Sequence, residues 1–129
     1  MTAVAALASY AQASASTAGP GEIVRMAYER VITACNRAQQ AEADLPSDWM
    51  QIFHDETLRG QAILVELTAG LAVDHADPAV VDLAEHLGEL YRFCIDQFID
   101  ANVYKDPEPL DDVRMVIHGL RDAWVRRAG

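Results

Sequence analysis

The chain has 129 residues, a length that supports one domain with its own hydrophobic core. Apolar residues make up 51% of the sequence but aromatic residues only 7%, so the core must come from aliphatic side chains and alanine, as in closely packed helices. The formal net charge of -10, from 20 acidic and 10 basic residues, repels phosphate backbones and anionic lipids, which excludes nucleic acid as an expected partner.

Residues 1–19 form a polar, alanine-rich leader that we expect to be flexible and able to dock as a short helix. The leader has no Lys or Arg before its short apolar run, and Ser9, Tyr10 and Gln12 break that run, so it does not match a secretory signal peptide. Nowhere does the chain contain 18 consecutive apolar residues, the length needed to span a membrane. We therefore expect a cytoplasmic protein that does not insert into membranes.

The first of four expected helices spans about residues 20–43. Its apolar residues recur every three or four positions, which is the spacing of one helical face. Pro20 fits the first turn, where its missing N–H costs nothing. The stretch "DLPSD" then breaks the pattern, and Ser47 or Asp48 is placed to cap the next helix.

The second expected helix spans about residues 48–72. Its inward-facing pattern includes one acidic residue, Glu56, among apolar positions. Gly60 lies in the middle of this helix and is either a site of close approach between helices or a weak point.

The third expected helix, about residues 78–102, starts where Asp77 can cap and Pro78 can open a helix. Its apolar stripe is the widest in the chain, so the helix is either buried on two sides or turns part of the stripe toward a groove. Periodicity leaves both possibilities open. A fourth helix at about residues 108–127 completes the pattern. Short connections between four helices predict an all-α fold, an antiparallel up-down four-helix bundle over residues 20–129.

The histidines do not match the motif of ferritin-like metal oxidases, which take a Glu-x-x-His pair from each of two helices. No acidic residue stands three positions before any of the four histidines; those positions hold Gln51, Ala72, Leu83 and Met115. The common nucleotide-binding, hydrolase and zinc-protease motifs are also missing from the sequence. Cys35 and Cys94 lie within apolar helical patterns, as buried free thiols do. We therefore expect no enzyme, no cofactor and no metal site, but a binding or structural role.

Two long stretches of the sequence resemble a known protein family, the flagellin-specific secretion chaperones of the FliS family. The first is "TAGPGEIVRMAYERVI", which resembles the family's Thr/Ser-Ala-Ser-Pro start and the apolar helix after it. The second is "LAEHLGELYRFCIDQFIDANVYKDPEPLDDVRMVIHGLRDAW". The positions that match the family pattern are Thr17, Ala18, Pro20, Ile23, Val24, Met26, Tyr28, Leu87, Leu90, Tyr91, Phe93, Ala101, Asn102, Asp106, Val113 and Trp124.

This resemblance implies a helical chaperone of the bacterial cytosol that binds the C-terminal segment of flagellin. Such a protein prevents premature polymerisation and keeps flagellin export-competent for the flagellar type III secretion apparatus, without catalysis or a cofactor. The physics is compatible, because an amphipathic segment can lay its apolar face into a hydrophobic groove. We expect a monomer or a weak homodimer.

For the client-binding surface we expect residues from three helices. The expected residues are Ile23, Met26, Ala27, Leu67, Leu71, Leu87, Tyr91, Ile95 and Asn102. For each apolar one, a plain core role is the alternative. Tyr10 has no helical stripe of its own, so we expect it to anchor the leader on the bundle, where the leader covers part of the groove. The competing interpretations are an adaptor or regulator that binds another amphipathic helix and, less favoured, a metal-binding bundle enzyme.

Overall fold

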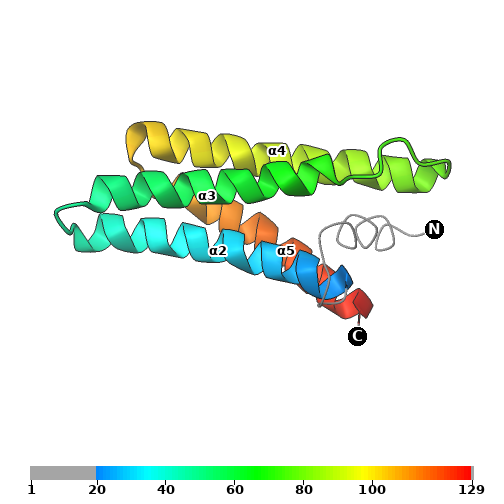
Figure 1. The fold of residues 1–129 in the computed structure, drawn as a ribbon, viewed down its shortest axis with the longest axis horizontal. Coiled ribbons are helices and arrows are strands. Elements are labelled where there is room, and N and C mark those ends of the chain that lie inside the picture. The colour runs from blue at the N-terminus through cyan, green and yellow to red at the C-terminus, as the bar shows by residue number, and fades with distance from the viewer. Residues whose placement is uncertain (1–19, 129) are drawn as a thin grey trace.

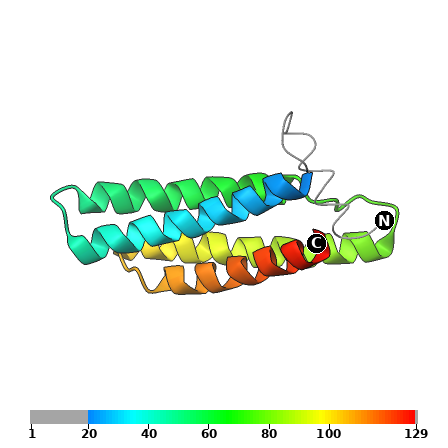
Figure 2. The same cartoon turned by 90° about the horizontal axis from the view of Figure 1, so that it is seen from below.

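Four long helices run alternately up and down in the computed structural model, which describes residues 20–128 (Figure 1). They are α2 (Pro20–Asp44), α3 (Trp49–Ala69), α4 (Pro78–Tyr104) and α5 (Pro109–Ala128). Helices α2 and α3 form one layer and α4 and α5 the other, and each helix packs against its two neighbours around the bundle (Figure 2). This arrangement confirms the predicted all-α, antiparallel four-helix bundle.

The core is built from the apolar stripes of all four helices, as their periodicity predicts. Tyr28 of α2 and Tyr91 of α4 meet across it, with their hydroxyl oxygens 2.7 Å apart and their ring centroids 6.4 Å apart. This hydrogen bond lets two polar groups lie in the core without loss of hydrogen bonding. Around them pack Val24, Val31, Cys35, Phe53, Leu64, Leu67, Cys94, Phe98, Leu110, Val113 and Ile117, all fully buried.

Gly60 is a site of close approach between α3 and α4. A Cβ atom at this position would lie only 2.3 Å from Cζ of Phe98, so the aromatic ring fills the space that any side chain would need. Of the two roles that the sequence left open for Gly60, the structure supports close packing.

Helix α2 ends at Asp44 because the next two residues cannot continue it. Leu45 adopts the left-handed conformation with φ 50°, and its N–H donates to the carbonyl of Ala41 at 2.9 Å. Pro46 follows and has no N–H to offer. The next helix has Asp48 at its N-cap position, but the Asp48 side chain makes no capping hydrogen bond.

Helix α3 ends at Ala69, three residues before the end expected from the apolar pattern. Gly70 follows as the C-cap and donates its N–H to the carbonyl of Glu66 at 3.3 Å, and Leu71 donates to Thr68 at 3.2 Å in a tighter turn. Glycine has a low helix propensity, so the helix stops at this residue although an apolar side chain follows.

Helix α4 begins as the sequence indicates and ends two residues later than expected. The Asp77 side chain accepts a hydrogen bond from the N–H of Ala79 at 2.9 Å, and Pro78 occupies the first turn. At the other end Lys105 adopts the left-handed conformation with φ 51°, and its ammonium group donates to the carbonyl of Asn102 at 2.8 Å. This bond satisfies a carbonyl of the last turn.

Trp124 of the C-terminal helix α5 contacts the first turn of α2. Its indole N–H donates to the carbonyl of Gly21 at 2.7 Å, while its ring is buried in the core. Within residues 20–128, no helix has both the length and the apolar character that crossing a membrane requires.

Candidate functional site

An apolar strip lies on the outside of the bundle along the seam between α3 and α4. One hydrogen bond shows which faces of the two helices meet there: the side chains of His54 and Asn102 are joined at 3.0 Å. Residues one to three turns away on the same helical faces follow the same seam. We call four of them the α3/α4 strip: Leu58 and Val65 of α3, with Ile95 and Ile99 of α4.

The α3/α4 strip leaves much of its apolar surface in contact with solvent. Leu58, Val65 and Ile99 are 44%, 55% and 42% exposed, whereas Ile95 is half-buried and packs against the core. Val103, one turn after Ile99, is exposed as well. Single exposed apolar residues are common on protein surfaces, but several on the facing sides of two adjacent helices make this seam a candidate interaction surface.

Asn102 holds one end of the strip in a fixed geometry. Lys105 donates its ammonium group to Oδ1 of Asn102 at 2.6 Å, so the amide nitrogen of Asn102 faces His54. That nitrogen can only donate, so Nδ1 of His54 accepts this hydrogen bond. Lys105 also lies 5.9 Å from the centroid of the Phe53 ring. The contact of the Lys105 ammonium group with Phe53 and the hydrogen bonds of Asn102 thus join α3 to the C-terminal end of α4.

The structure places the other expected site residues at three different depths. Leu67, Leu87 and Tyr91 lie in the core, while Ile23, Ala27 and Leu71 are half-buried at its edge. Met26 is 39% exposed on the outside of α2. Of the expected residues, Asn102 lies on the α3/α4 seam beside His54, whereas Leu71 lies near Gly88 toward the other end of α4. Tyr10 lies outside the described residues.

The other flank of α4 also exposes apolar side chains. Leu90 and Phe93 are three residues apart on one helical face, and both are partly exposed. Gln97, one turn after Phe93, donates to Asp112 of α5 at 3.2 Å, so this face borders α5. The middle of the wide apolar stripe of α4 therefore packs in the core, and its two edges are partly exposed beside α3 and α5.

Sequence reasoning missed Leu58 and Val65. A signal for them exists: they are seven residues apart, so they share a face, but they are out of phase with the buried positions of α3. Apolar residues that recur at helical spacing outside the buried face are the pattern of a second, solvent-facing contact surface.

The two cysteines are buried and unreactive at neutral pH. Both Cys35 and Cys94 are free thiols in the core, and burial raises the pKa of each to about 12. The thiolate is the nucleophilic form, so these side chains are protonated and unreactive at neutral pH. Within residues 20–128, His, Cys, Asp and Glu side chains form no group of three or more that could hold a metal ion.

Comparison with known proteins gives a consistent result over nearly the whole chain. The family model described as "Flagellar protein FliS" matches residues 3–128. The flagellar secretion chaperone FliS of Bacillus subtilis strain 168 is 28% identical over 115 residues, which cover 89% of this chain and 80% of that protein. The flagellar secretion chaperone FliS of Vibrio cholerae El Tor Inaba N16961 is 28% identical over 109 residues, covering 84% of this chain and 75% of that protein. Because this family model matches nearly the whole length of the chain, the chain belongs to the FliS family of flagellar proteins.

Proposed function

We propose that this protein is a flagellar export chaperone that binds the C-terminal segment of flagellin in the bacterial cytosol. Binding prevents premature polymerisation of the subunit and keeps it export-competent for the flagellar type III secretion apparatus. The relatives that the chain matches are both named flagellar secretion chaperones, which supports the general role. The observation that carries the proposal is the α3/α4 strip, an apolar surface exposed along the seam of a well-packed bundle.

The chemistry of the strip fits an amphipathic client. A segment whose apolar face packs against other subunits in a filament is exposed and prone to association while the subunit is free. Leu58, Val65 and Ile99 offer that face an alternative apolar contact along two helices. Because ordering a flexible client costs conformational entropy, we expect a long interface that extends beyond the strip. This role needs neither catalysis nor a cofactor.

Isothermal titration calorimetry tests this function directly. The full chain is titrated with the C-terminal segment of the flagellin encoded in the same genome, and the N-terminal segment of that flagellin serves as the control ligand. We expect a one-to-one complex with Kd on the order of micromolar or tighter for the C-terminal segment only. Absence of heat at concentrations of tens of micromolar, on the order of 10 times that Kd, contradicts the proposal.

Charge insertion then locates the surface. Leu58→Glu and Ile99→Glu place a carboxylate in the strip, and we expect each to weaken binding by roughly tenfold or more. Met115→Glu is the matched control, because Met115 is a 68% exposed apolar residue of α5, outside the strip. Circular dichroism checks that all three variants keep the helical fold. Equal affinities for the three variants would place the client elsewhere on the bundle.

A further inference from the structure

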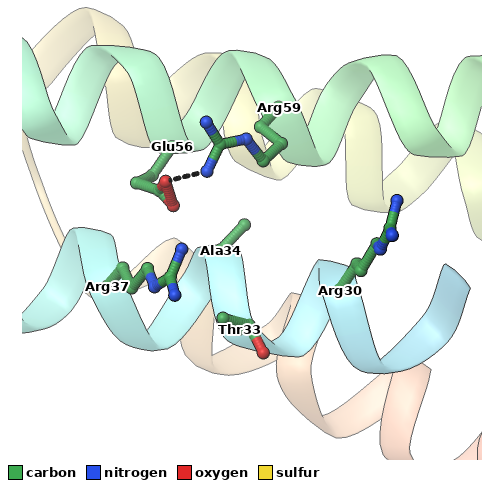
Figure 3. A pocket seen from close by; sticks show the side chains of 6 residues that line it. All are labelled: Arg30, Thr33, Ala34, Arg37, Glu56 and Arg59. Atoms are coloured by element: carbon green, nitrogen blue, oxygen red, sulfur yellow. Dashed lines mark hydrogen bonds and ion pairs between the residues drawn. The ribbon is translucent and has the colours of Figure 1, made fainter. Parts of the chain in front are cut away.

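A hollow of about 350 Å³ opens between α2 and α3 on the outside of the bundle (Figure 3). Arg30 and Arg37 enter it from α2, and Glu56 and Arg59 from α3, with Ala34 between the two α2 arginines. Three arginines and one glutamate thus line the hollow, on a chain whose formal net charge is -10. The hollow is therefore a local concentration of positive charge on an otherwise acidic protein.

Glu56 is buried in this hollow with only one of its two carboxylate oxygens hydrogen-bonded. Its side chain is 8% exposed, and Oε1 accepts from Arg59 Nη1 at 2.5 Å. Oε2 is also buried but accepts no hydrogen bond in the part of the chain that the structure describes. Its carboxylate points into the space between the two helices (Figure 3). Buried polar atoms are almost always paired, so this oxygen lacks the hydrogen bond that such an atom normally has within the bundle.

Arg30 and Arg37 are also available for a partner. Neither forms an ion pair or a hydrogen bond across residues 20–128, whereas Arg59 is held by Glu56 and Arg25 by Glu22 and Glu29. Both residues are exposed. Their guanidinium groups can therefore reorient toward an acidic ligand without breaking an existing contact.

The spacing of the two arginines selects among anionic ligands. They are seven residues apart, which corresponds to about 10.5 Å along the helix axis. Figure 3 shows the two guanidinium groups well separated, with Ala34 between them. At this separation, two carboxylates carried by one polypeptide can each pair with one of the two guanidinium groups. Guanidinium groups bind carboxylates in a bidentate manner, which gives such a contact its geometry.

We propose that this hollow binds an acidic, amphipathic segment of the client protein, with two of its carboxylates on Arg30 and Arg37. Met26 lies one turn before Arg30 on the same face of α2 and is 39% exposed, so it offers the segment an apolar contact beside the charges. The inference rests on the proposed chaperone function and adds a charge-based selection of the client to the apolar contact with the α3/α4 strip.

Single charge reversals in the full chain test this assignment. Arg30→Glu and Arg37→Glu are compared with Arg121→Glu, which makes the same change in net charge on α5, outside the residues that line the hollow. In calorimetric titrations with the C-terminal flagellin segment, we expect the two hollow variants to bind roughly tenfold more weakly or worse, and the control to stay within about twofold of the unmodified chain. We also expect Arg37→Glu to lower the dependence of the affinity on salt.

A reciprocal substitution gives a positive readout. Acidic residues of the flagellin segment are changed to lysine one at a time, and one such change should restore binding to Arg37→Glu while weakening binding to the unmodified chain. If the unmodified chain binds but Arg30→Glu and Arg37→Glu behave like Arg121→Glu, the acidic-segment assignment is wrong and the chaperone function stands. If the unmodified chain does not bind the segment, both proposals fall together.

Discussion

At the scale of single residues, the packing of Phe98 on Gly60 is the most demanding contact between α3 and α4. Because an added Cβ would meet the ring at 2.3 Å, Gly60→Ala forces the ring or the helices to shift. We expect this substitution to lower the free energy of unfolding by about 1–3 kcal/mol. Urea unfolding followed by circular dichroism measures the change.

Gly119 offers a matched control for that substitution. It also lies within a helix, but a Cβ there meets nothing within 4 Å. Gly119→Ala should therefore raise the free energy of unfolding by about 0.5–1 kcal/mol, because alanine is the better helix former. Changes of opposite sign in the free energy of unfolding support the close approach at Gly60. Equal changes for the two variants would show that α3 and α4 separate easily at this point.

The buried thiols predict a pH dependence. Burial in the folded state raises the pKa of Cys35 and Cys94 from 9.0 to about 12, so the unfolded chain loses its thiol protons first as the pH rises. Their contribution to stability is complete below about pH 9 and is lost between about pH 9 and pH 12. We expect no reaction with a thiol reagent at pH 8 in the native protein and complete reaction in urea. Fast labelling of the native protein would contradict the burial of these side chains.

At the scale of the helices, two N-caps with the same residue type behave differently. Asp77 accepts a hydrogen bond from the backbone of α4, whereas the side chain of Asp48 makes no such bond at the start of α3. Asp77→Ala should therefore lower the free energy of unfolding by about 0.5–2 kcal/mol. The Asp48→Ala variant should change it by less than about 0.5 kcal/mol in the same urea titration. A larger loss for Asp48→Ala would overturn this assignment of the caps.

The same comparison shows which features of the helices were predictable from the sequence. The existence of the helices and the cap at Asp77 depend on residues close together in the chain, and both were predicted. The ends of α3 and α4 depend on particular local contacts, such as the bond from Gly70 to Glu66 and the left-handed Lys105, which an apolar pattern does not reveal. Periodicity therefore placed the helices but gave their ends only approximately.

At the scale of the whole molecule, the surface left free depends on which helices become neighbours. The stripe of α4 was too wide for one seam, but only the assembled bundle shows Tyr91 in the core and Ile99 facing solvent. Leu58 and Val65 form a candidate binding surface only together with residues of α4, and α4 is distant from them in the sequence. The hollow at Glu56 likewise needs arginines from two helices. Sites formed between helices are thus the part of the account that a single sequence could not provide.

The central claim is that this protein keeps flagellin from polymerising by covering its C-terminal segment. Light scattering from purified flagellin monomers, seeded with short filaments, measures this directly. With one equivalent of the unmodified chain, we predict that filament growth stops or slows severely, that Met115→Glu acts equally well, and that Ile99→Glu has lost most of the effect. Filament growth at an unchanged rate in the presence of the unmodified chain would contradict the account.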